Sequence, residues 1–320
     1  MSVGTVRTID CLYGGPEVAA AYLVVEGVRA AFVDNNTNRA LPLLLAALDE
    51  AGLSRNAVDY LIVTHIHLDH AGGTAALLEQ CPNAVVLCHP RAARHLANPT
   101  RLVAGATQVY GREVFEELYG EIRPIDEGRI RSMDDGEALG MGGRVFRFLH
   151  TPGHASHHCC IHDSRSNGVF AGDAFGLHYP SLQRGGRPCI MCSSTPTEFD
   201  AEAARRSVRR IVETGASRVY VGHFGEVTDV SAAADVLLTS IDDMENAMRE
   251  AVECGADGDD LEAFCRARVE AAALRRISEC GVTVRPEERA RLDADIWINA
   301  RGLAYAAAKR RKKPMETMGE

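Results

Sequence analysis

A dense group of metal-ligating side chains, placed directly after an apolar run, limits the folds open to this chain. The segment Leu61–Gly73 reads LIVTHIHLDHAGG, so three histidines and one aspartate fall within six positions. An apolar strand that runs into such a loop places these groups at its carboxyl end, where α/β sheets hold their sites. Borderline divalent metals favour imidazole and carboxylate ligands. The segment therefore predicts a metal site in a sheet-based fold.

The spacing within this loop divides the four side chains into two pairs. Alternate residues of an extended chain point the same way, so His65 and His67 can reach one ion. Asp69 and His70 then point elsewhere, which suits a second ion. The alternative is a solvated polar loop with chance histidines, and the density of imidazoles argues against it.

Three further apolar runs each lead into one more candidate ligand. His154 lies in TPGHASHH after the run Phe146–Leu149, Asp173 ends the run VFAGD, and His223 ends the run VYVGH. Each of these ligands directly follows a glycine, which lets the backbone approach closely. Together with the first loop they supply five histidines and two aspartates, enough for two metal ions that share a bridging carboxylate.

The rest of the chain shows two kinds of pattern. Up to about residue 228, short β-rich runs alternate with helical ones, which is typical of a layered α/β fold with two half-sheets. After residue 229 the strand signals stop. We expect three helices there, near Ser231–Cys254, Asp259–Cys280 and Pro286–Lys309.

Composition excludes several functional classes. The 320 residues include 35 basic and 44 acidic ones, and the net charge of −9 argues against general binding to nucleic acid or anionic lipid. No run approaches the ~20 apolar residues of a membrane-spanning helix, and the amino terminus lacks a signal pattern, so we expect a cytoplasmic protein. Its ten cysteines are then reduced and mostly buried. Cys189 and Cys192 form one CxxC, which is weak support for a structural zinc.

The ordered ligand set resembles the metallo-β-lactamase superfamily over about residues 3–228. The resemblance implies a four-layer αββα metallo-hydrolase domain over residues 1–229, followed by a helical carboxyl-terminal extension over residues 230–320. It implies two divalent ions, zinc first, with iron or manganese as alternatives. It also implies that Asp34 supports the site from outside. The implied ligands are His65, His67 and His154 for the first ion, Asp69, His70 and His223 for the second, and Asp173 as the bridge.

The runs TPGHASHH and GDAFGLHYP are most similar to those of an uncharacterised prokaryotic branch of hydrolases. The site predicts that a metal-bridging hydroxide cleaves an ester, thioester or lactone of a small molecule. Our hypothesis for Asp69 is that it relays a proton to the leaving group. The alternative is a diiron oxygen-binding or redox protein, although the flavodiiron branch carries a glutamate at the position of His67. A third hypothesis is a non-catalytic ligand-sensing protein. An intact ligand set argues against it.

The residues that contact the substrate are expected in the Gly-, Pro- and Arg-rich stretch 175–197, as part of the pocket rim. The candidates are His178, Tyr179, Arg184 and Arg187. His157 and His158 are interpreted as packing or supporting residues, because the metal sites are already filled. A small-molecule substrate is the expected partner, without nucleic acid or membrane, and the helical extension could form a homodimer.

Overall fold

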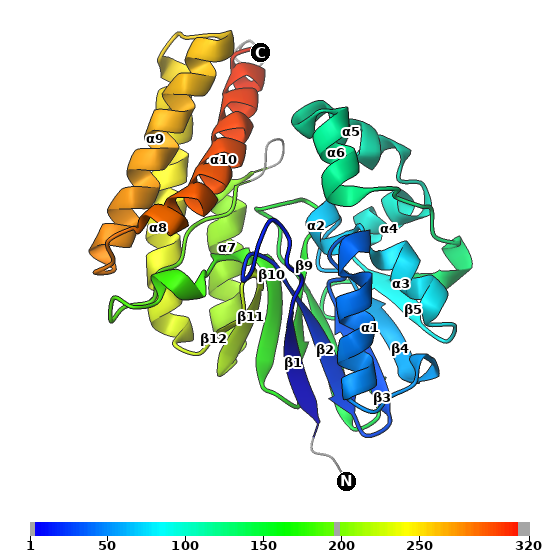
Figure 1. The fold of residues 1–320 in the computed structure, drawn as a ribbon. Coiled ribbons are helices and arrows are strands. Elements are labelled where there is room, and N and C mark those ends of the chain that lie inside the picture. Colours follow the sequence, from blue (N-terminus) through cyan, green and yellow to red (C-terminus); the bar gives the residue numbers. More distant parts are fainter. Residues whose placement is uncertain (1–3, 195–198, 313–320) are drawn as a thin grey trace, which may run out of the picture.

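Two six-stranded sheets lie face to face, and helices cover the outer side of each (Figure 1). The computed structural model describes residues 4–194 and 199–312. The order of the first sheet is β1 (Thr5–Asp10), β2 (Ala20–Glu26), β3 (Arg29–Val33), β4 (Val58–Ile62), β5 (Val85–Cys88) and β6 (Ile130–Ser132). The order of the second is β12 (Glu226–Val227), β11 (Arg218–His223), β10 (Gly168–Leu177), β9 (Cys159–Asp163), β8 (Arg144–His150) and β7 (Ala138–Met141). The four-layer α/β fold is thus confirmed.

The helices follow the chain in two groups. The first half of the chain carries α1 (Leu41–Glu50), α2 (Leu68–Ala71), α3 (Thr74–Gln80), α4 (Pro90–Ala97), α5 (Thr100–Tyr110) and α6 (Arg112–Tyr119). The second half carries α7 (Ala201–Glu213) and then the helical extension, which consists of α8 (Val230–Glu253), α9 (Gly258–Glu279) and α10 (Pro286–Lys312). Among the described residues, no helix combines the length and the apolar character needed to cross a membrane.

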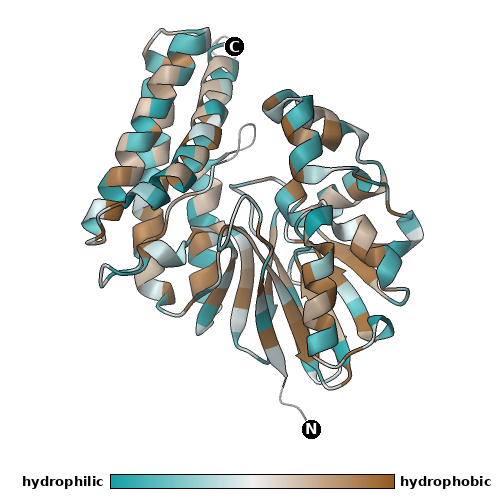
Figure 2. Cartoon of the chain, viewed as in Figure 1, coloured by the Kyte–Doolittle hydropathy of each residue, from teal (hydrophilic) through white to brown (hydrophobic). Residues whose placement is uncertain are grey.

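Alternation along β2 shows why the two sheets stack. Ala21, Leu23 and Val25 face the covering helices, whereas Tyr22 and Val24 face the second sheet. Both faces are apolar, so the strand is buried on both sides, as its continuous hydrophobic run predicts. Figure 2 shows hydrophobic segments along the strands, whereas the helices carry both hydrophilic and hydrophobic segments. Burial of both sheet faces holds the ends of β4, β8, β10 and β11 at one edge of the sandwich.

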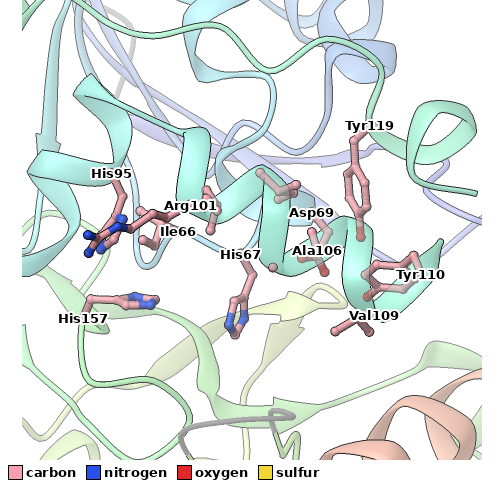
Figure 3. A pocket seen from close by; sticks show the side chains of 13 residues that line it. Ile66, His67, Asp69, His95, Arg101, Ala106, Val109, Tyr110, Tyr119 and His157 are labelled. Carbon is pink, nitrogen blue, oxygen red and sulfur yellow. The ribbon is translucent and has the colours of Figure 1, made fainter. Parts of the chain in front are cut away.

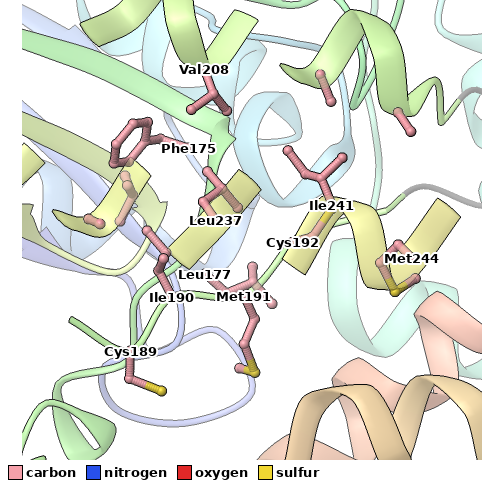
Figure 4. Packing of buried hydrophobic residues seen from close by; sticks show 14 of the residues in the cluster. Phe175, Leu177, Cys189, Ile190, Met191, Cys192, Val208, Leu237, Ile241 and Met244 are labelled. Atoms are coloured by element: carbon pink, nitrogen blue, oxygen red, sulfur yellow. The ribbon is translucent and has the colours of Figure 1, made fainter. Parts of the chain in front are cut away.

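The helical extension shares one continuous core with the second sheet. Figure 4 shows Phe175 and Leu177 of β10 packed with Val208 of α7 and with Leu237 and Ile241 of α8. The same cluster includes Leu261 of α9 and Leu292 and Leu303 of α10, all nearly inaccessible to solvent. It also buries Cys189 and Cys192, and the convergent groups of metal-ligating side chains in the described part of the chain contain no cysteine.

Several elements escaped prediction because their sequences carry little periodic signal. The edge strands β6 and β7 are short and largely exposed, with the sequences IRS and ALGM. Helix α5 contains no buried residue, so its apolar side chains do not mark a core-facing stripe. In the extension, by contrast, each of the three helices begins within one residue of its predicted start.

Candidate metal centre

Three imidazoles converge at the first expected ion position. His65 and His67 follow β4, and His154 lies in the loop between β8 and β9. The Nε2 atoms of His65 and His154 each lie 3.0 Å from Nδ1 of His67. A tetrahedral zinc with Zn–N bonds of about 2.0–2.1 Å would hold two ligand nitrogens about 3.3 Å apart. The three rings are therefore spaced as ligands of one ion.

A second group of ligand atoms lies beside the first. Asp69 and His70 belong to the short helix α2, which starts directly after the first loop, and His223 is the last residue of β11. The Oδ2 atom of Asp69 lies 3.3 Å from Nε2 of His223 and 3.6 Å from Nε2 of His70. One nitrogen from each histidine and one carboxylate oxygen thus face a common point.

Asp173 lies between the two groups, with one carboxylate oxygen toward each. Its Oδ2 is 3.4 Å from Nε2 of His154, whereas its Oδ1 is 3.1 Å from Nε2 of His70 and 3.5 Å from Nε2 of His223. This is the geometry expected of a bridging carboxylate. The structure therefore brings together all seven side chains that the sequence predicts as ligands.

Two buried atoms at this site support a bound cation. His70 Nε2 and Asp173 Oδ1 are both buried and lie 3.1 Å apart, but they form no hydrogen bond of good geometry. Buried polar atoms are rarely left unsatisfied, because each one costs about 1–3 kcal/mol. A divalent ion would satisfy both atoms, and the imidazole and carboxylate donors suit a borderline metal.

The first group consists of neutral imidazoles. Burial lowers the pKa of His65 and of His67 well below the ordinary value, and the surrounding imidazoles lower it further. Burial also lowers the pKa of His154, although Asp173 opposes the shift. Neutral imidazole is the form that binds a metal, so these rings need no deprotonation.

The second group holds both protons and negative charge. Burial lowers the pKa of His223, but Asp173 and Asp69 outweigh it and raise the pKa to about 9. In the same way, the three carboxylates around His70 raise its pKa well above the ordinary value. Burial raises the pKa of Asp173, but His223 and His70 outweigh it and hold the pKa well below its usual range. A divalent ion would take the place of these protons.

Asp34 orients the ligands from outside the site, as the resemblance implies. Its carboxylate accepts hydrogen bonds from the backbone N–H and the hydroxyl of Thr64, at 2.9–3.0 Å. It also lies 2.9 Å from Nδ1 of His70, on the ring edge away from the ion position. A carboxylate behind a ligand imidazole fixes the ring and its tautomer. Val18 plays the same part for His223, because its carbonyl oxygen lies 2.9 Å from Nδ1 of that ring.

Asp173 does not end a strand, contrary to the prediction. Strand β10 continues to Leu177, and its pairing with β11 is interrupted on both sides of Gly172. Gly172 has a φ of +46°, and a Cβ there would lie 2.5 Å from the Thr64 hydroxyl. This bulge turns the next residue, Asp173, toward the other ligands. His158 lies behind it and accepts a hydrogen bond from the backbone N–H of Asp173 at 3.3 Å.

Sequence reasoning missed a polar connection from the helical extension to the site. The Ser193 hydroxyl donates to Asp173 Oδ2 at 3.0 Å, and the Ser193 carbonyl oxygen lies 3.1 Å from Nδ1 of His154. The next residue, Ser194, donates from its backbone N–H and its hydroxyl to Oδ1 of Asn299 in α10, at 2.8 and 2.6 Å. Serine and asparagine at these positions form no motif, so no sequence signal marked them.

A cavity of about 360 Å³ opens over the candidate metal ligands (Figure 3). His67 and Asp69 form part of its lining, and most of the wall comes from α5 and from residues near it. The other lining residues are Ile66, Leu68, His95, Arg101, Leu102, Gly105, Ala106, Val109, Tyr110, Tyr119 and His157. The cavity has the size of a small-molecule site.

None of the four predicted substrate contacts lines this cavity. Tyr179 is buried and donates a hydrogen bond to Asp295 of α10 at 3.2 Å, and Arg184 forms an ion pair with Glu288 of the same helix. Arg187 lines a separate pocket beside α8 and α9, and His178 is held near the Phe224 carbonyl. The stretch after Asp173 therefore packs against the extension instead of forming the rim. Residues 195–197 of that stretch lie outside the described residues.

Comparison with known proteins agrees with this fold. Residues 14–223 match the family model described as the metallo-beta-lactamase superfamily. The metallo-beta-lactamase fold-containing protein ST1585 of Sulfurisphaera tokodaii is 25% identical over 217 residues, which cover 67% of this chain and 75% of that protein. A metallo-beta-lactamase family protein of Thermus thermophilus has a solved structure that superposes with a TM-score of 0.61 at 21% identity, over 96% of this chain and 93% of that one.

Two further relatives have an activity in their names. Coenzyme F420H(2) oxidase of Methanothermobacter marburgensis is 27% identical over 66% of this chain and 46% of its own length. Atrochrysone carboxyl ACP thioesterase of Aspergillus fumigatus is 23% identical over 68% of this chain and 56% of its own length. The chain thus spans about half the length of these two relatives.

Proposed function

The chain belongs to the metallo-β-lactamase superfamily, and we propose that it is a dinuclear metal-dependent hydrolase that cleaves an ester, thioester or lactone of a small molecule. The position of Asp173 carries this proposal, because its two carboxylate oxygens face two separate groups of ligand atoms. A thioesterase among the relatives supports the reaction class.

Two divalent ions held by these seven side chains would supply a hydroxide nucleophile at neutral pH and polarise the scissile carbonyl. The protein's own part is to hold seven ligands rigidly and to admit the substrate from one side. Asp69 lines the cavity, so its carboxylate can reach a leaving group as well as a metal. We propose that Asp69 passes a proton to the leaving group.

A diiron redox protein is the second candidate, and one relative favours it. The coenzyme F420H(2) oxidase shares 27% identity with this chain. The donor set on this scaffold differs in having His67 where the flavodiiron branch has a glutamate. Three neutral imidazoles favour zinc or another borderline metal at the first position.

Metal analysis of the purified protein, beside a screen of thioesters, lactones, aryl esters and phosphodiesters, separates these candidates. We expect two ions per chain, with zinc predominant, and hydrolysis of at least one carbonyl substrate. Asp173→Asn should lose about one ion or more per chain and reduce kcat by at least a hundredfold. His162→Ala serves as the control, because this histidine lies on β9 outside the site.

Two results would overturn the proposal. Full metal content and full rate in His67→Ala or Asp173→Asn would show that the ligands are assigned wrongly. Bound iron, visible absorption and no hydrolysis of any substrate would replace the hydrolase with the redox protein.

A further inference from the structure

We infer that the substrate joins an apolar group to an anionic group, with the apolar group lying along helix α5 over Gly105 and the anionic group at Arg101. This inference rests on the proposed function and deepens it by naming the class of substrate. The evidence for it is the set of residues that line the cavity.

The face of α5 toward the cavity is apolar and only partly covered by its neighbours. The helix has no buried residue, and Leu102, Ala106 and Val109 line the cavity with their side chains partly accessible. Apolar surface left in water costs about 25 cal/mol per Å². A contiguous apolar wall above a metal centre therefore suits a ligand that covers it.

Gly105 leaves open space in the middle of this wall. A glycine inside a helix costs about 0.5–1 kcal/mol relative to alanine. Crowding by neighbouring atoms does not explain the glycine, because a Cβ at Gly105 would meet no atom within 4 Å. The residue lines the cavity, so its missing side chain keeps the space above the metal ligands free for an apolar group.

Arg101 supplies positive charge at one end of the same helix. Its side chain lines the cavity, is exposed to solvent and forms no ion pair with any carboxylate of the described residues. By comparison, Arg112 of the nearby helix α6 has an acidic partner, because its Nη1 lies 3.8 Å from Oε1 of Glu116. A guanidinium without an acidic partner, at the wall of a cavity, is suited to bind a carboxylate or phosphate of the substrate.

The order of these groups places the reacting bond between them. Figure 3 shows Arg101 with His95 and His157 on one side, Val109 and Tyr110 on the other, and His67 between them. A substrate held at both ends would therefore present its scissile carbonyl above the candidate metal ligands. The enzyme should discriminate by both the length of the apolar part and the charge of the anionic part.

Two types of thioester test this, since either the acyl or the thiol part could carry the charge. The probes are S-octanoyl-3-mercaptopropionate and the mono-S-hexyl thioester of succinic acid. The references are their uncharged amides and their two-carbon apolar counterparts. In each, water adds its oxygen to the acyl carbon, the carbon–sulfur bond breaks and a proton goes to the thiolate. We expect kcat/KM for at least one probe to exceed both of its references about tenfold or more.

Substitutions in α5 assign the two effects to their residues. Arg101→Gln should remove the preference for charge, and Gly105→Phe should remove the preference for the longer apolar group by lowering kcat/KM for long substrates more than for short ones. Gly105→Ala should leave the melting temperature unchanged or higher, because alanine favours a helix. Arg112→Gln and Ala104→Phe are the matched controls, since both side chains are exposed and neither lines the cavity.

Binding provides a readout that does not depend on turnover. N-hexyl succinamate cannot be cleaved as a thioester, and calorimetry should show about tenfold weaker binding to Arg101→Gln and to Gly105→Phe than to the parent protein. Binding with this dependence but no hydrolysis of any substrate would sustain the inference and overturn the proposed function. Hydrolysis with no preference for charge or length would overturn the inference and leave the proposed function standing. Preferences that survive both substitutions would do the same.

Discussion

Single residues of the candidate centre differ in charge state, although all of them face the same small volume. Burial keeps the rings of His65 and His67 neutral. On the other side of Asp173, carboxylates keep His70 and His223 protonated in the metal-free protein. The two ion positions are therefore expected to respond differently to pH.

Metal binding at the second position should release protons at neutral pH. His223 has a pKa of about 9 and must lose its proton to bind an ion, so affinity should rise with pH up to about 9. Calorimetric titration of metal into the metal-free protein at pH 7, in buffers of different ionisation heat, should show buffer-dependent heats. Heats that are identical in every buffer would contradict the assigned charge states.

The raised pKa of His223 also determines how the stability of the metal-free protein changes with pH. A histidine whose pKa is raised by folding stabilises the protein below its unfolded value of about 6.5, and this contribution is lost as pH rises toward the folded value. The metal-free protein should therefore lose stability between about pH 6.5 and 9. Chelator-treated samples followed by thermal unfolding give the measurement.

The seven side chains that converge in the structure could be picked out from the sequence because each one is marked locally. Five histidines and two aspartates follow apolar runs or crowd into one loop, so their chemistry and position are both visible. Ser193 and Asn299 carry no such local mark. They are linked through Ser194, which follows Ser193 and contacts Asn299 of α10, 105 residues further along the chain.

At the scale of whole elements, helices and strands with an unusual burial pattern are harder to predict from the sequence. Strand β10 reads as a short strand that ends at Asp173, but a bulge at Gly172 lets it continue. Helix α5 has no buried face, so helical periodicity does not mark it. The sequence therefore indicates a pocket rim in the stretch after Asp173, whereas much of the wall of the observed cavity comes from α5.

Helix α10 should support the metal centre through one side chain. Asn299→Ala leaves the backbone N–H and the hydroxyl of Ser194 without their acceptor, so we expect a loss of about 1–3 kcal/mol in the free energy of unfolding. Metal affinity should also fall, because the adjoining Ser193 contacts Asp173 and His154. Chemical denaturation and competitive metal titration measure the two effects.

Two matched variants complete this test. Asn299→Asp retains the acceptor oxygen and should recover part of the metal affinity. Asn246→Ala removes an exposed asparagine of α8 whose side-chain oxygen accepts a hydrogen bond from Arg249, and should behave as the parent protein. Unchanged metal affinity in Asn299→Ala would show that α10 plays no part in the site.

On the scale of the whole molecule, the division into residues 1–229 and 230–320 does not separate two cores. One hydrophobic cluster runs from β10 through α7 and α8 to α9 and α10. The predicted boundary matches the start of the helical extension, but the apolar surfaces on its two sides cover each other.

The full chain should consequently unfold in one cooperative transition. Elements that share a continuous core cannot lose it separately without exposing apolar surface on both parts. Differential scanning calorimetry of the metal-free protein should give a single peak. Two resolved peaks, or a fragment 1–229 that binds two ions with the parent's affinity, would show that the extension is an independent unit.

The distribution of the ligands along the chain also has a consequence during synthesis. His65 is made early, but Asp173 follows more than 100 residues later, His223 later still, and Asn299 near the end. A nascent chain on the ribosome cannot hold the first ion in its proposed set before Asp173 has emerged, nor the second before His223. Any ion bound earlier would be held by a partial set of these side chains.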